Sequence, residues 1–377
     1  MIVKFILGTS LAFGTLFYNV ITNSNENAHF ISKHLNHKKN GNLIWETELD
    51  STIVSFPQMS QSNDVFITTY SGQIFCLNSV SGEIKWKLQV GRFKSIFEPC
   101  NRTGKLFALT PALGRLLSID QNSGTILSDK IINEFKTTKF ITTLDGSDIV
   151  ISGGSDNHIY LVNAVSGEIK WATKADSRIT KSPVICAKKE LIFFNTNNKI
   201  YLVNKKNGKI KKIHSIDSDK LTGPSENSPK KIYYGCNNGF LYSIDCQSGE
   251  LDQVYKANAS ISVAPVVNNQ GHIFFQSDNG FNYALDSQTK KIIWQKQIGL
   301  NGNVPIQFNQ NGNLIAHCNL NELASLCSKT GKLLWSFELS EYGMIWPTSA
   351  LIISDNYERG LILSGHGIKM RAYFTLR

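Results

Sequence analysis

Short runs of hydrophobic residues, broken by polar clusters, fill the chain after residue 40. Residues 183–186, 191–195, 199–204 and 209–213 are typical: the runs are rich in β-branched and aromatic residues, and clusters of Lys, Asn and Gly separate them. Runs of this length and composition between such clusters indicate β-strands joined by turns. The pattern therefore predicts an all-β chain built from units of four strands.

One turn motif recurs at a nearly constant spacing. The sequence SGEIKW occurs at residues 81–86 and again at 166–171. With looser copies there are eight turns, at intervals of 41, 42, 43, 41, 41, 41 and 41 residues, and Lys290 takes the glycine position in one of them. The motif glycines are Gly41, Gly82, Gly124, Gly167, Gly208, Gly249 and Gly331. Five of the six tryptophans follow the turn position by four residues, at Trp45, Trp86, Trp171, Trp294 and Trp335.

Prolines give a second, independent measure of the repeat. Seven of nine share one position in the unit, with Ile141 at the missing step: Pro57, Pro99, Pro183, Pro224, Pro265, Pro305 and Pro347. We expect the motif glycine to supply a positive φ between the third and fourth strands. We expect the tryptophan to pack between neighbouring sheets, because its apolar surface is large. Asp or Asn stands four residues before the turn position in many units, where a side-chain cap of the turn is favoured over ion binding: Asp120, Asn163, Asn204, Asp245 and Asp286.

Four strands in about 40 residues, repeated eight times, predict an eight-bladed β-propeller of four-stranded antiparallel blades. The two ends of the repeat complement each other. Residues 42–49 form only the last strand of a unit, whereas residues 347–375 supply three strands. Pairing Leu43–Leu49 with the C-terminal strands would complete the eighth blade and remove two open edges. Residues 41–377 are therefore predicted to be one propeller domain.

The N-terminus differs from the repeat. Lys4 precedes an apolar stretch, and residues 1–22 have the features of a signal peptide or an N-terminal membrane anchor. A buried first helix of the fold is the alternative, since apolar segments of this length also occur in cores. Residues 23–40 are polar and are expected to be a linker. We therefore expect an exported protein, with membrane association through the N-terminus if the segment is kept.

Composition narrows the classes of protein. The 377 residues include 21 Phe, 12 Tyr and 6 Trp, which excludes a disordered chain, and the one long apolar stretch excludes a polytopic membrane protein. The net charge of +10 is spread thinly rather than gathered into Arg/Lys clusters, so nucleic acid is not an expected partner. The seven cysteines show no paired or metal-binding spacing, which argues against a disulfide framework and against a zinc site.

The repeat unit resembles that of the PQQ-like propellers. Residues 159–171, IYLVNAVSGEIKW, show the hydrophobic–Tyr–hydrophobic start, the Asn, the Ser-Gly turn and the Trp of that repeat. Eight such units behind an export signal are similar to the BamB family, the propeller subunits of the bacterial outer-membrane β-barrel assembly machinery. The resemblance implies a monomeric, non-catalytic scaffold in the periplasm that binds protein partners. Many members are lipoproteins, whereas the first cysteine here is Cys76, so lipid anchoring is not expected.

Two other classes share the repeat. Quinoprotein dehydrogenases hold a quinone and calcium, and many have an adjacent Cys-Cys pair and long insertions, which this chain lacks. We therefore expect no cofactor, no metal and no catalytic residues. A propeller acting as a sensor or accessory module, including a secreted or membrane-anchored eukaryotic one, is the second alternative. Asn101 and Asn258 would then be glycosylation acceptors.

For partner binding, the sequence suggests residues 214–230 as a contact loop. They form one of the longer connections, in which Lys220, Lys230 and Lys231 flank Gly223-Pro224. A loop that is merely solvated is the alternative, since charged loops usually are.

Overall fold

A computed structural model gives the fold of the chain. It describes residues 43–374 apart from residues 56, 61, 63, 93–95, 101, 145, 187–189, 226–229, 299–305, 309–311, 320–321, 339–347 and 354–360. The chain divides into two compact units, Met1–Lys39 and Asn40–Arg377, and all described residues belong to the second. The segments expected at 1–22 and 23–40 lie outside the described residues. No helix within the described ranges is long and apolar enough to cross a membrane.

Within the described residues, 32 strands form eight four-stranded antiparallel sheets. Blade 1 comprises β2 (Gln58–Met59), β3 (Asp64–Thr68), β4 (Gln73–Asn78) and β5 (Ile84–Gln89). Blade 2 comprises β6 (Ile96–Cys100), β7 (Lys105–Thr110), β8 (Arg115–Asp120) and β9 (Ile126–Ile131). Blade 3 comprises β10 (Phe140–Thr143), β11 (Asp148–Ser152), β12 (His158–Asn163) and β13 (Ile169–Lys174). Blade 4 comprises β14 (Val184–Cys186), β15 (Leu191–Asn195), β16 (Lys199–Asn204) and β17 (Ile210–Ser215).

The remaining blades follow the same order. Blade 5 comprises β18 (Leu221–Pro224), β19 (Lys231–Cys236), β20 (Phe240–Asp245) and β21 (Leu251–Lys256). Blade 6 comprises β22 (Val266–Val267), β23 (His272–Gln276), β24 (Phe281–Asp286) and β25 (Ile292–Gln297). Blade 7 comprises β26 (Gln307–Phe308), β27 (Leu314–Asn319), β28 (Glu322–Leu326) and β29 (Leu333–Glu338). Blade 8 combines β30 (Thr348–Ile353), β31 (Leu361–His366) and β32 (Lys369–Phe374) with the first strand of the chain, β1 (Leu43–Glu48).

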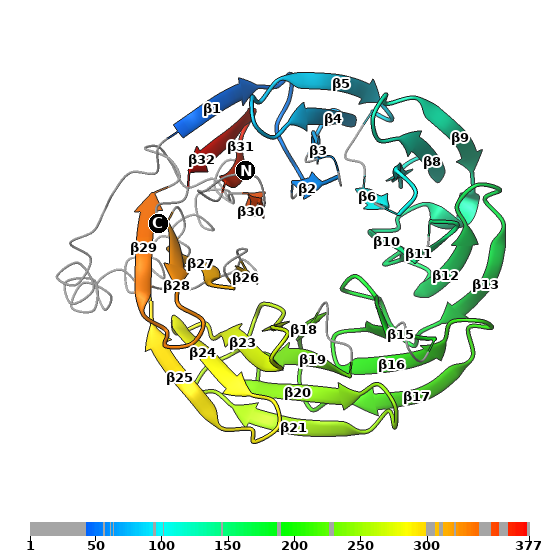
Figure 1. Cartoon of the computed structure of the whole chain (residues 1–377). Coiled ribbons are helices and arrows are strands. Elements are labelled where there is room, and N and C mark those ends of the chain that lie inside the picture. Colours follow the sequence, from blue (N-terminus) through cyan, green and yellow to red (C-terminus); the bar gives the residue numbers. More distant parts are fainter. Residues whose placement is uncertain are drawn as a thin grey trace, which may run out of the picture. The chain divides into compact units, whose positions relative to one another are not determined.

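Figure 1 shows the blades of this unit side by side in a ring, with the first strand of each innermost and the fourth at the periphery. The two faces of a blade both meet neighbouring blades, so its middle strands are buried along their whole length, as in β11 and β15. Successive side chains of β15 point to opposite sides. Phe193 lies in a cluster with Tyr234 of blade 5, and Phe194 packs with residues of blade 3. The core is thus distributed over the interfaces between blades.

The N-terminal strand closes the ring. Strand β1 pairs antiparallel with β32, in a register that places Trp45 opposite Ala372 and Glu48 opposite Lys369. Glu46 forms ion pairs with Lys369 and Arg371, both at 2.6 Å. These contacts confirm the predicted closure of an eight-bladed propeller by its own N-terminal strand.

The antiparallel order places the connections on two opposite rims. We call the side that carries the connections from first to second and from third to fourth strands the turn rim; residues 163–168 and 204–209 are examples. We call the opposite side the linker rim, because it carries the connections between blades, such as 175–183 and 216–220. A short 3₁₀ helix, η1 (Asn133–Phe135), lies in the connection between blades 2 and 3.

Candidate functional site

The repeated turn on the turn rim is a self-contained structure. In blade 3 the Asn163 side-chain oxygen accepts hydrogen bonds from the backbone N–H groups of Val165 and Ser166, at 3.0 and 2.9 Å. Gly167 has a φ of 78° and donates its N–H to the Asn163 carbonyl. The same side-chain cap is made by Asn78, Asp120, Asn204, Asp245 and Asp286. As the spacing predicts, these side chains serve the turn.

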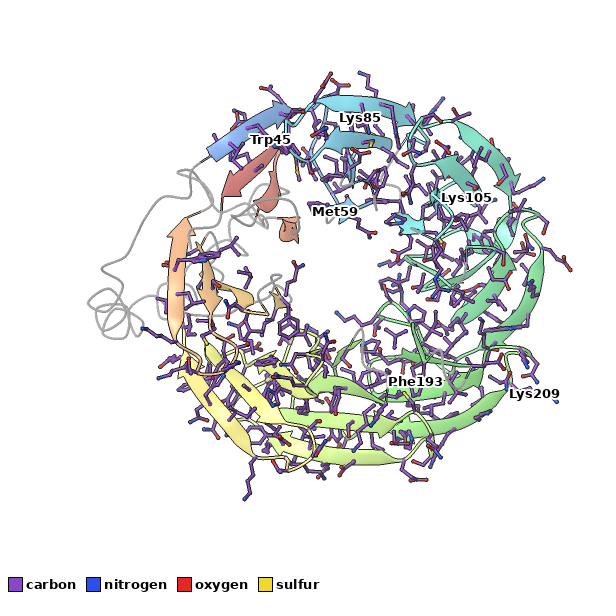
Figure 2. The ribbon with its side chains drawn as sticks, in the orientation of Figure 1. Trp45, Met59, Lys85, Lys105, Phe193 and Lys209 are labelled. Carbon is purple, nitrogen blue, oxygen red and sulfur yellow. The ribbon has the colours of Figure 1, made fainter. Side chains whose placement is uncertain are left out.

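The repeated tryptophans contact the turn of the next blade. The indole N–H of Trp45 in blade 8 donates to the Ser79 carbonyl of blade 1 at 2.9 Å. A Cβ added to Gly82 would lie 2.5 Å from the Trp45 ring, so the ring rests directly on this glycine. Figure 2 shows Trp45 on β1 at the junction with blade 1. The same pair of contacts joins Trp86 to Gln121 and Gly124, Trp171 to Lys205 and Gly208, and Trp294 to Ser328 and Gly331.

The predicted set has two further members, Trp335 and Gly41. Trp335 is buried at 6% exposure on the outer strand of blade 7. Gly41 lies outside the described residues.

Three blade junctions lack the tryptophan and are held by other contacts. Between blades 5 and 6, Gln253 stands in the tryptophan position and Lys290 in the glycine position. Lys290 adopts a φ of 57° and its ammonium binds the Asp252 carboxylate of blade 5 at 2.6 Å. A side chain is tolerated at this turn because the described contacts place no indole ring over it.

At the junction of blades 4 and 5, Lys212 replaces the tryptophan. Its ammonium binds Glu250 at 2.5 Å, and a ring nitrogen of His214 contacts the Gly249 carbonyl at 2.7 Å. At the junction of blades 2 and 3, Ser128 replaces the tryptophan, and Lys130 and Ile132 pack against Gly167 instead. The residues at the repeated and substituted positions therefore hold neighbouring blades together. A binding site has to be sought at other residues.

The structure separates the three lysines suggested as contacts. The stretch 214–230 is not a single connection, because His214 and Ser215 end β17 and Leu221–Pro224 form β18. Lys220 precedes β18 on the linker rim. Lys230 and Lys231 follow it on the turn rim, where Lys231 opens β19. The prediction of one long connection missed β18, a short innermost strand that ends at Gly223-Pro224.

A different lysine accompanies Lys220 on the linker rim. Lys181 stands just before β14, at the inner end of blade 4, and is half-buried. Burial lowers the pKa of Lys181 below its ordinary value of 10.5, and the positive charge of Lys220 lowers it further. The sequence search missed Lys181. A usable signal was its place two residues before the repeated proline, where the next two units carry Thr222 and Val263.

The described residues offer little reactive chemistry. They contain no group of three or more His, Cys, Asp or Glu side chains that could hold a metal ion. Burial raises the pKa of the Cys76 thiol to about 12, so this cysteine stays protonated at neutral pH. The Tyr160 hydroxyl donates to the Asp156 carboxylate, beside His158. Desolvation and this hydrogen bond raise the pKa of Tyr160, which makes the hydroxyl a structural donor.

The ring of four-stranded blades, with its repeated turn and inter-blade tryptophans, defines a PQQ-like β-propeller. A family model described as outer membrane protein assembly factor BamB matches residues 34–296 and 231–357, and the chain belongs to this family. No curated protein matches the sequence.

Solved structures of similar fold are distant in sequence. BamB from Moraxella catarrhalis has a TM-score of 0.64 at 13% identity, and the match covers 89% of this chain and all of that one. Sqt1 of Saccharomyces cerevisiae has a TM-score of 0.71 at 12% identity, with 90% and 100% covered. The computationally designed Ika8 protein has a TM-score of 0.68 at 13% identity, with 87% and 98% covered. At these identities the structural matches establish the fold alone.

Proposed function

We propose that this protein is a non-catalytic scaffold of the bacterial cell envelope that binds protein partners and assists the assembly of outer-membrane β-barrel proteins. The observation that carries the proposal is the family match, which extends from residue 34 to residue 357 and so includes most of the propeller. The description of that family names outer-membrane assembly. The signal-like features of residues 1–22 support export of the chain.

The fold suits a binding role. Binding residues on rigid scaffolds are concentrated in the loops that the scaffold presents. Here the blades present two rims, and their fourth strands leave an open peripheral edge on which an extended segment could add a strand. A partner protein can therefore be held through loops, through an added strand, or through both.

Affinity capture tests the proposal. The tagged full-length protein, incubated with detergent-solubilised bacterial envelopes, should recover a component of the outer-membrane assembly machinery. Because Lys220 and the Lys230–Lys231 pair lie on opposite rims, Lys220→Glu and the double variant Lys230→Glu/Lys231→Glu should affect capture differently, with unchanged melting temperatures. The rim whose variant loses the partner is the binding rim.

A folded bait that recovers no envelope protein would contradict the assembly role. Such a result would favour the alternative of a sensor or accessory propeller with a different partner. A circular dichroism melt of the same bait preparation provides the control for folding.

A further inference from the structure

Lys181 is a partly buried cation for which the described residues provide no acidic partner. Other partly exposed lysines are neutralised: Lys170 by Asp148 at 2.7 Å, and Lys369 by Glu46 at 2.6 Å. Across the residues that the structure describes, no ion pair or hydrogen bond engages the Lys181 ammonium, and the only charge that acts on it noticeably is that of Lys220. Partial burial of the ammonium and its repulsion by a second cation both disfavour the charged form of Lys181.

Small residues of the next two blades lie close to the Lys181 stem. A Cβ placed on Gly223 of blade 5 would lie 3.8 Å from the Lys181 Cβ and 3.9 Å from the Ala264 Cβ of blade 6. Lys181 is only half-buried, so part of its side chain stays accessible from the linker rim. Lys220 precedes the same strand, β18, and brings its charge to the same rim.

We propose that Lys181 and Lys220 form a binding site for an acidic peptide segment of a partner protein, at the inner margin of the linker rim. A carboxylate placed between the two ammonium groups would remove their repulsion and supply the missing counter-charge, through short charge-assisted hydrogen bonds. That the partner is a protein follows from the proposed scaffold role, on which this site depends.

The surroundings favour a narrow peptide over a membrane surface. Asp217 and Asp219 are exposed on the same rim, in the connection that leads to Lys220. A flat anionic bilayer would meet these carboxylates together with the lysines. A single Asp or Glu side chain of a peptide can instead approach the two lysines without contacting Asp217 or Asp219. Membrane binding needs a broad, exposed basic face.

A labelled hexaglutamate peptide is the probe for the test. Its binding to the full-length protein, followed by fluorescence anisotropy, should be saturable. Lys181→Met should weaken binding about tenfold, the scale of one charge-assisted hydrogen bond. Lys181→Arg should retain most of the affinity, which separates loss of charge from loss of fold, and Lys220→Met should have a smaller effect.

Lys209→Met is the matched control. Lys209 is exposed at the turn-rim end of β17 (Figure 2), while Lys220 lies beyond the other end of that strand, and the control removes the same unit of charge. Its affinity should equal that of the unaltered protein. Equal weakening by Lys209→Met and Lys181→Met would overturn the proposal, because the peptide would then be sensing only the net charge of +10.

Two further measurements complete the test. Reductive ¹³C-methylation and NMR titration should show the pKa of Lys181 rising when the peptide is added, and an unchanged value would contradict the site. Vesicles of phosphatidylglycerol and phosphatidylcholine should not depend on Lys181 for binding; if they do while the peptide does not bind, the site recognises lipid. If envelope capture succeeds and peptide binding fails, this site is wrong and the scaffold role stands.

Discussion

At the scale of single residues, each turn glycine under a tryptophan meets two separate demands. Gly208 has a φ of 67°, in the region that L-residues disfavour, and an added Cβ would approach the Trp171 ring to 2.6 Å. Gly249 shares the first demand, with a φ of 70°, but its nearest neighbour would be Leu202 at 3.2 Å. The two glycines thus share one backbone conformation and differ in how closely neighbouring side chains approach the position of an added Cβ.

We predict that Gly208→Ala destabilises the protein more than Gly249→Ala. The left-handed backbone should cost each variant about 1–2 kcal/mol. Crowding against the indole should cost Gly208→Ala about 1–3 kcal/mol more. Urea unfolding of both variants measures the difference. Equal losses in the free energy of unfolding would show that the indole ring moves aside at little cost and does not require glycine at this position.

At the scale of elements, β1 contributes both ladder hydrogen bonds and a junction tryptophan. It is the fourth strand of blade 8, and its Trp45 packs on Gly82 of blade 1. Residues just after β1 add further backbone bonds, from Leu49 to Ile368 and from Ile53 to Gly367. Loss of this strand would leave blade 8 with an open edge and blade 1 with an uncovered turn.

A chain that begins at residue 51 should therefore melt at a much lower temperature than one that begins at residue 40. The comparison removes β1 while keeping the rest of the propeller, and differential scanning calorimetry records both midpoints. The shorter chain should also bind a hydrophobic dye such as ANS, because apolar surface is uncovered. Coincident melting curves would contradict the closure.

The closing strand should also make stability sensitive to acid. Hydrogen bonds from Lys369 and Arg371 lower the pKa of Glu46 below its ordinary value of 4.5. A carboxyl group with a lowered folded-state pKa contributes stability above pH 4.5 that is lost as the pH falls through the folded-state pKa. The pair is partly exposed, so the contribution should be about 0.5–1 kcal/mol. Glu46→Gln should lower stability by this amount at pH 7 and by little at pH 3, as followed by urea unfolding; a constant difference at both pH values would refute the assignment.

At the scale of the whole molecule, the blades are regular and their connections are short, which leaves recognition to rims and edges. We predict that the protein neither binds PQQ nor oxidises alcohols or aldoses. Reconstitution with PQQ and Ca²⁺, followed by absorbance spectroscopy and dye-linked assays, checks both points. A stoichiometric quinone signal with turnover would place the chain among the quinoprotein dehydrogenases and end the scaffold proposal.

The periodic features of the fold were predictable from the sequence, and the exceptions were not. Eight blades and the pairing of Leu43–Leu49 with the C-terminal strands follow from evenly spaced glycines and tryptophans. The contact of Lys290 with Asp252 could not be foreseen, because it joins a departure from the repeat to a variable position that lies 38 residues earlier in the chain. Lys181 escaped notice for a similar reason: its half-burial arises from the packing of separate blades, which neither its residue type nor the spacing of the repeat indicates.

The pairing of β1 with β32 has a consequence for how the chain is made. Leu43 is synthesised well before its partner Tyr373, which follows it by 330 positions in the chain. At typical synthesis rates β1 waits roughly 15–65 s for that partner, with its edge available to other chains. Because β32 and β1 are antiparallel neighbours, a short turn could join residue 377 to residue 42, with new ends placed between Gln89 and Ile96. In such a circular permutant the four strands of the eighth blade would follow one another in the chain. The pairing of β1 with β32 would then be a local contact instead of a distant one. Stopped-flow refolding should then be faster than for the natural order, because local contacts form sooner than distant ones.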